Sequence, residues 1–179
     1  MMIGAAIIAA AVVVAPPVQT SATTSPKTSA PASVPAPASA PTSMTNTTTI
    51  SGTFDVKMTP QSSAVEAAQI GRFSLDKAYH GDLEATAAGE MIAVMTGEKG
   101  SAGYVAIERV TGTLAGRKGT FALQHSATMD RGTANLTIVV IPDSGTDGLT
   151  GISGTMGIRV EAGGKHFYDF TYALPPAAK

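Results

Sequence analysis

Short alternating segments separated by turn residues repeat along residues 50–174, and this pattern constrains the fold more than any other feature of the chain. In the first segment, apolar Phe54, Val56 and Met58 alternate with polar neighbours. A period of two is typical of a strand with one buried face. The pattern predicts eight strands, at residues 50–58, 70–79, 82–96, 101–114, 120–129, 133–141, 149–161 and 165–174.

Turn residues between these segments favour hairpin connections throughout. Gly97 to Gly100, Pro142 to Gly148 and Gly163-Gly164 are typical turn or loop sequences, and only residues 61–69 favour a short helical turn. Many short strands with hairpin turns indicate an all-β sandwich or barrel. Closure removes unpaired strand edges, so we predict an eight-stranded antiparallel β-barrel. A barrel of this size encloses side chains and about one small ligand.

The first 49 residues differ in composition from the rest. Residues 3–15 form an uninterrupted apolar run, shorter than the ~20 residues that span a bilayer but as long as the core of a signal peptide. We therefore interpret residues 1–22 as a signal peptide or apolar leader and residues 23–49 as an Ala/Pro/Ser/Thr-rich disordered linker before the barrel domain, residues 50–175. The expected location is periplasmic or secreted, or tethered by an uncleaved leader, without an integral membrane domain.

Charge and composition exclude several classes of function. Lys27 is the sole charged side chain in residues 1–49, so the rest carries 11 basic and 13 acidic side chains, which is no nucleic-acid footprint. The chain has no cysteine, which excludes disulfides and thiolate chemistry. Three histidines without ligand spacing do not predict zinc or another metal. No phosphate-binding glycine motif is present, so we expect no cofactor.

Residues 101–129 form the predicted hairpin with the richest chemistry. A two- or four-residue loop between its strands places Tyr104 and Glu108 on one face with His125, among apolar residues that would line the barrel interior. A three-residue loop would instead place Arg109 beside His125. The first arrangement is preferred, because the second would align Val105, Ile107 and Arg109 with the mainly apolar face and would leave no plausible set of side chains exposed.

These lumenal groups have both a functional and a structural interpretation. A Glu–His pair can act as general acid and base, and the Tyr104 hydroxyl could donate a hydrogen bond to a ligand oxygen. Tyr168 and Tyr172 could line the opposite wall. Alternatively, Glu108, His125 and Tyr104 form a satisfied polar network that fixes strand register and performs no chemistry.

The remaining charged candidates are expected at the surface. If His80-Gly81 forms a two-residue loop, Lys77 faces Glu84 as an ordinary cross-strand ion pair. His80 in this turn and His166 at the start of a strand are also predicted to be surface residues.

Several runs together resemble the bacterial domain-of-unknown-function family 3224 (DUF3224) across residues 50–175. That family is similar to the allene-oxide-cyclase-like barrels, which include plant dirigent proteins. The resemblance implies an eight-stranded antiparallel barrel, often oligomeric in the wider superfamily, with no assigned reaction. The runs that carry it are GDLEATAAGEM (81–91), SAGYVAIERVTGTLAGRKGTFALQHSATMDRG (101–132), PDSGT (142–146), GLTGISGTM (148–156) and GKHFYDFTYALP (164–175).

Three functions follow as hypotheses. The first is binding of a small apolar molecule in the lumen of an exported barrel. The second is an enzyme that cyclises or isomerises a reactive apolar substrate, which rests on fold analogy alone. The third is a homo-oligomeric interaction module, whose lumen would be filled by Phe121, Met129, Met156 and Phe170.

Overall fold

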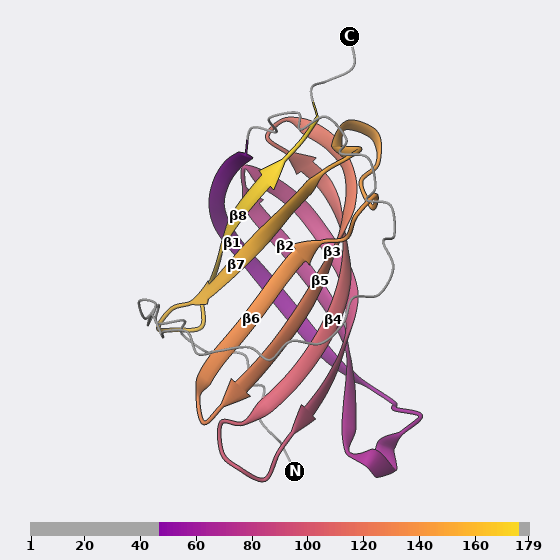
Figure 1. Ribbon diagram of the computed structural model, residues 1–179, viewed down its shortest axis with the longest axis vertical. Helices are drawn as coiled ribbons and strands as arrows, with labels where there is room; N and C mark the ends of the chain where they lie inside the picture. The colour runs from indigo at the N-terminus through magenta and orange to yellow at the C-terminus, as the bar shows by residue number, and fades with distance from the viewer. Residues whose placement is uncertain (1–46, 176–179) are drawn as a thin grey trace, which may run out of the picture. The chain divides into compact units, whose positions relative to one another are not determined.

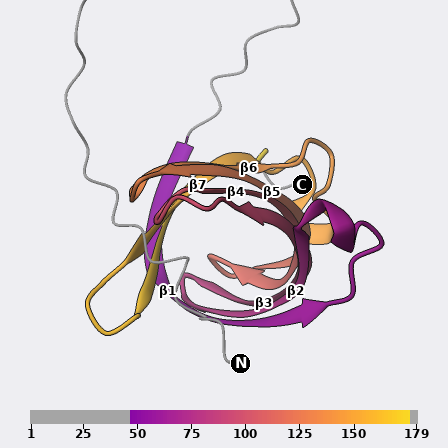
Figure 2. The ribbon, with the colours of Figure 1, turned by 90° about the horizontal axis from the view of Figure 1, so that it is seen from below.

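Eight antiparallel strands pair in sequence order, and the last strand pairs with the first, which closes the sheet into a barrel (Figures 1 and 2). The computed structural model describes residues 47–175. The predicted eight-stranded barrel is therefore confirmed. The strands are β1 (Thr47–Gln61), β2 (Ile70–Gly81), β3 (Leu83–Met95), β4 (Ala102–Leu114), β5 (Arg117–Asp130), β6 (Thr133–Val140), β7 (Ser153–Val160) and β8 (His166–Ala173).

Two short 3₁₀ helices, η1 (Glu66–Ala68) and η2 (Asp147–Leu149), complete the described secondary structure. The first lies in the segment predicted to form a helical turn. The predicted leader, residues 1–22, and all but the last three residues of the predicted linker, residues 23–49, lie outside the described residues. No helix within residues 47–175 has the length and apolar character needed to cross a bilayer.

Strand boundaries differ from the prediction at β1, β5 and β7. β1 begins at Thr47 and continues through Pro60 to Gln61, beyond the predicted end at Met58. Proline is tolerated there because β1 pairs with β8 only as far as Phe54, so Pro60 lies on a stretch with a free side. β5 begins three residues early, at Arg117. β7 begins four residues late, because Asp147–Leu149 forms η2.

One end of the barrel is sealed, and we call it the plugged end. Here the segment 141–152 between β6 and β7 folds against β5: the Thr146 amide donates to the Thr120 carbonyl at 2.9 Å, and the Ala122 amide donates to Ser144 Oγ at 3.0 Å. Leu149 and Ile152 from this segment are buried in the large hydrophobic cluster. Large inward side chains fill this half, among them Phe121, Phe170, Tyr168, Leu83 and Leu114.

The opposite end, which we call the open end, carries the β1–β2, β3–β4, β5–β6 and β7–β8 connections. In Figure 1 the first three of these lie at the lower end, and the β7–β8 connection lies higher, at the left. A small buried cluster of Leu75, Met91 and Ala106 lies on the open side. Beyond it, inward-facing side chains are only partly buried, which means that packing becomes incomplete toward this end. They are Met58, Phe73, Ala93, Tyr104, Ala127 and Met129.

Candidate functional site

A cluster of ionisable side chains lies inside the barrel, centred on Glu108 of β4. Its Oε1 atom accepts hydrogen bonds from the Tyr79 hydroxyl at 2.7 Å, from Lys77 Nζ at 3.1 Å and from His125 Nε2 at 3.2 Å. Lys77 Nζ also lies 2.9 Å from Oε2. Glu108, His125 and Lys77 are 1%, 3% and 8% exposed, so this is a buried ionic network.

Strand alternation explains why the charges lie at this depth. On β4, Glu108 is flanked on the inner face by Ala106 of the small cluster and Val110 of the large cluster. On β2, Lys77 lies in the same way between Leu75 and Tyr79. The ionic cluster therefore forms a polar layer between two apolar layers, and the layer on the open side is the thinner and less well buried one.

Gly89 of β3 leaves the space that Glu108 occupies. It lies directly opposite Glu108 in the β3–β4 register. A Cβ atom at this position would overlap the Ile107 carbonyl oxygen and lie 2.7 Å from the Glu108 Cβ. The two strands therefore approach too closely here for any side chain on β3.

The electrostatics of the cluster keep Glu108 ionised. Burial acts to raise its pKa, but the hydrogen bond from His125 and the positive charge of Lys77 outweigh burial and lower the pKa of Glu108 to about 2. Burial and then the charge of Glu108 raise the pKa of Tyr79 well above its ordinary value. Burial and the same charge raise the pKa of Tyr104 to about 12. Both phenols are therefore neutral hydrogen-bond donors at physiological pH.

The β4–β5 register confirms the preferred arrangement of the central hairpin. The loop consists of Ala115 and Gly116. It lies two residues before the two-residue loop considered above, at Arg117-Lys118, but it puts the same residues of the two strands on the same face. Tyr104, Glu108 and His125 consequently share the inner face, whereas Arg109 points outward and is exposed. The structure brings Glu108 and His125 into contact and places Tyr104 on the open side of them.

The two predicted tyrosines of β8 also point inward, but they lie in the plugged half. The Tyr168 ring packs edge-on against Tyr79 at 5.6 Å, and its hydroxyl accepts from the Leu83 amide and donates to the His80 carbonyl, each at 3.3 Å. Tyr172 packs against Phe170 at 5.3 Å. Neither hydroxyl is hydrogen-bonded to the ionic cluster.

The predicted surface pair between Lys77 and Glu84 is wrong. Tyr79 lies opposite Ala85 rather than Asp82, so the assumed two-residue loop at His80-Gly81 is wrong as well. Lys77 consequently points into the barrel, where it pairs with Glu108, and Glu84 is exposed. Lys77 and Tyr79 are thus cluster members that the sequence prediction missed. Their spacing of two residues from Leu75 and Phe73, which puts all four on one face of the strand, was a visible signal.

The two other histidines lie away from the cluster. His80 is exposed as predicted, with Nε2 3.3 Å from Asp55 Oδ2. His166 is partly buried, with its ring 4.9 Å from Phe54. Within residues 47–175, no three His, Asp or Glu side chains gather as metal ligands.

Comparison with known proteins assigns the barrel to a family. The fold defines a closed all-β barrel. The family model described as "Protein of unknown function (DUF3224)" matches residues 50–172, and the chain belongs to that family. A crystal structure of a DUF3224 protein of unknown function from Shewanella oneidensis MR-1 is 47% identical, with a TM-score of 0.68, over 73% of this chain and 100% of that chain. No curated protein matches.

Proposed function

We propose that the protein binds a small apolar molecule in the open half of the barrel lumen. The carrying observation is the contrast between the two halves: large inward side chains are buried at the plugged end, whereas at the open end those beyond Leu75, Met91 and Ala106 are only partly buried. The partly buried groups are mainly apolar, and they lead to a layer of hydrogen-bonding groups. Ligand sites typically combine apolar walls with a few polar groups that fix orientation.

The plugged half is not part of the proposed site. Phe121 and Phe170 stack there at 5.7 Å, and Met156 is buried beside them. These three residues fill that half of the lumen, while Met129 is only partly buried and lies toward the open end. The ligand is accordingly small, with an apolar body held by residues such as Phe73 and Met91 and a polar group directed at Tyr104 and the ionic layer.

Titration of the full chain with N-phenyl-1-naphthylamine, a fluorescent apolar probe, tests this proposal. Ala93 lies opposite Tyr104 on the inner face near the open end, so Ala93→Phe should fill the entrance and weaken probe binding about tenfold or more. Absence of saturable binding to the wild type would contradict lumenal binding.

Ala88→Phe is the matched control on the outer face of the same strand. Ala88 lines a surface depression of about 420 Å³ together with Asp76, Thr86, Arg109 and Thr111. The control should leave the affinity for the probe unchanged. If Ala88→Phe rather than Ala93→Phe abolishes binding, the outer depression is the binding site and the lumenal proposal fails.

A second candidate function, self-association, is favoured by an exposed apolar patch on the outer face of β3 and β4. Ile92, Val94, Val105 and Ile107 form this patch and are 41–56% exposed, and Ile92 lies opposite Val105 in the register. Contiguous apolar patches typically mark interaction surfaces.

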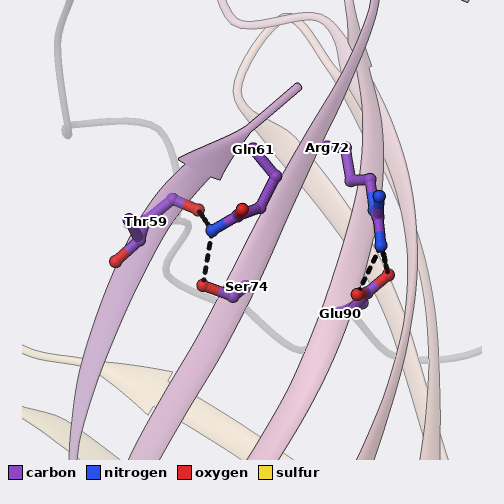
Figure 3. A network of polar contacts seen from close by, with 5 residues as sticks. All are labelled: Thr59, Gln61, Arg72, Ser74 and Glu90. Atoms are coloured by element: carbon purple, nitrogen blue, oxygen red, sulfur yellow. Dashed lines mark hydrogen bonds and ion pairs between the residues drawn. The ribbon is translucent and has the colours of Figure 1, made fainter. Parts of the chain in front are cut away.

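We propose that a second copy of this chain covers the patch. Arg72 and Glu90 adjoin the patch and form an ion pair, with Arg72 Nη2 2.6 Å from Glu90 Oε1, so their charges cancel each other (Figure 3). The patch therefore does not repel its own copy, as a surface of one sign would. Sedimentation equilibrium of the full chain should detect a dimer at micromolar concentration, and a monomer over the whole range would contradict this candidate.

Export remains a separate proposal, supported by the apolar run of residues 3–15 and the Pro/Ala/Ser/Thr-rich segment that follows it. Fractionation of cells that express the full chain, with a measurement of the intact mass, tests it. Export with cleavage predicts an extracytoplasmic species shortened by about the length of a signal peptide. A full-length membrane-bound species would support the tethered alternative, and a full-length cytoplasmic species would contradict export.

A further inference from the structure

Glu108 cannot serve as the base of the cluster, although it is the central carboxylate. Three donors already occupy its Oε1 atom, and Oε2 faces the Lys77 ammonium at 2.9 Å. A carboxylate stabilised by this many donors and a positive charge holds its charge and is a weak proton acceptor. The group that accepts a proton therefore has to be sought among its neighbours.

His125 is the neighbour with a free acceptor. An ionised carboxylate only accepts hydrogen bonds, so the contact between Glu108 Oε1 and His125 Nε2 requires the proton to lie on Nε2. In the neutral imidazole, Nδ1 then carries the lone pair. Within residues 47–175, Nδ1 has no hydrogen-bond partner. It is also not fully enclosed by protein, because the only fully enclosed side-chain atom without a hydrogen-bond partner in these residues is Glu108 Oε2, whose 2.9 Å contact with Lys77 is an ion pair without hydrogen-bond geometry.

Tyr104 supplies a second group without a protein partner. Its hydroxyl forms no hydrogen bond to any other residue of the described chain, in contrast to Tyr79 and Tyr168. Tyr104 is paired with Ala127, and His125 with Ala106, so the two side chains are diagonal neighbours on the inner face of β4 and β5. Diagonal neighbours are ~7–8 Å apart at most, within reach of one small molecule between two long side chains.

We propose that His125 and Tyr104 form a proton-transfer site for an uncharged carbonyl compound, with Glu108 as the positioning residue that fixes the imidazole tautomer. This assignment rests on the proposed function, because the compound occupies the same open half of the lumen. The ionic pair of Lys77 and Glu108 is neutral overall, so the layer favours an uncharged polar group over a carboxylate.

The chemical step is an isomerisation through an enolate. The C–H bond next to the carbonyl breaks, its proton moves to His125 Nδ1, and its electron pair forms the enolate, whose oxygen accepts a hydrogen bond from Tyr104. In a carbonyl compound whose C=C bond joins the β- and γ-carbons, the enolate is a dienolate, and return of the proton from the imidazolium to the γ-carbon gives the α,β-unsaturated isomer without any co-reactant. Glu108 stabilises the transient imidazolium through Nε2, as carboxylates do in other carboxylate–imidazole pairs.

The test uses 5-nitrobenzisoxazole as the probe, because loss of the proton on C3 of its isoxazole ring to a base breaks the N–O bond and gives a coloured cyanophenolate. The full-chain protein should accelerate this ring opening over buffer. His125→Gln should remove about a hundredfold of the acceleration. The control His80→Gln alters an exposed imidazole outside the lumen and should change the rate by less than about twofold. Equal rates in the wild type and His125→Gln overturn the assignment.

A measurement on the wild type alone covers the case in which His125→Gln does not fold. Long-range ¹H–¹⁵N correlation spectra distinguish the two imidazole tautomers. We expect the proton on Nε2 of His125 and none on Nδ1, and a proton on Nδ1 of the neutral ring overturns the assignment.

Displacement of N-phenyl-1-naphthylamine by 5-nitrobenzisoxazole separates the two proposals. Displacement without ring opening overturns proton transfer and leaves lumenal binding intact. If N-phenyl-1-naphthylamine does not bind saturably and no displacement is seen, both proposals are contradicted. Displacement with His125-dependent ring opening supports both.

Discussion

At the scale of single residues, the buried Lys77–Glu108 pair carries a large desolvation cost. Both side chains are almost fully buried, so each lost its hydration when the barrel closed. Their mutual attraction and the hydrogen bonds from Tyr79 and His125 offset this loss. Replacing only one partner should therefore be much worse than replacing both.

The double variant Lys77→Met/Glu108→Gln checks this expectation, because the amide carbonyl that the second substitution introduces can still accept from Tyr79 and His125. At pH 7, Glu108→Gln alone should lower the free energy of unfolding by about 3–5 kcal/mol, since it leaves a buried ammonium unpaired. The double variant should recover most of that loss in urea unfolding. If it is less stable than Glu108→Gln, the two charges do not compensate each other.

The low pKa of Glu108 predicts a loss of stability in acid. Its pKa is about 2 in the folded barrel against an ordinary value of 4.5, so the stabilisation is fully present above pH 4.5 and disappears as the pH falls toward 2. The contribution at neutral pH is about 3 kcal/mol. Urea unfolding between pH 7 and 2 should show a shallower loss for Lys77→Met/Glu108→Gln than for the wild type, and identical slopes would contradict the prediction.

At the scale of elements, the sequence predicts strands better than the register between them. Alternation identified all eight strands, and the preferred even-length loop placed Glu108 and His125 on one face, whereas the three-residue alternative would have placed Arg109 beside His125. The β2–β3 turn was misjudged, since His80-Gly81 has the composition of a two-residue loop, yet Tyr79 pairs with Ala85. That single error hid Lys77, the counter-ion of Glu108.

The packing of residues 141–152, which seal the plugged end, also could not be predicted from local sequence patterns. Residues 142–148 have the composition of a surface loop, and the structure confirms that they form no strand. Their packing against β5 depends on hydrogen bonds that the hydroxyl oxygens of Ser144 and Thr146 accept from backbone amides more than 20 positions away. Periodicity contains no information about such distant partners.

The close approach of β3 and β4 at Gly89 gives a prediction for these two strands. Gly89→Ala should lower the free energy of unfolding by about 1–3 kcal/mol, because the methyl group overlaps the backbone of β4 beside Glu108. Gly97→Ala is the matched control in the following turn, where an added Cβ meets no atom within 4 Å. Thermal or urea unfolding measures both, and equal effects would show that strand separation at Gly89 is not limiting.

At the scale of the whole molecule, the outer patch of β3 and β4 predicts a change in assembly. Ile107→Lys places a charge in the middle of the patch and should shift sedimentation of the full chain from dimer toward monomer. Val65→Lys is the control, because Val65 is similarly exposed, at 52% against 56%, but lies outside the patch. A dimer that survives Ile107→Lys would have to use another surface.

Closure of the barrel is uneven around its circumference. β6 and β7 are paired only at Val139 and Thr155, whereas the other neighbouring strands are paired along most of their length. Seven of the eight strand–strand interfaces of the barrel are therefore extensively paired, and the β6–β7 interface closes the barrel through a single residue pair. Separation of β6 from β7 breaks few hydrogen bonds, so among the strands we expect amide hydrogen exchange to be fastest at the β6–β7 interface. Transient separation of β6 from β7 would then widen the lumen laterally while the other strands stay paired.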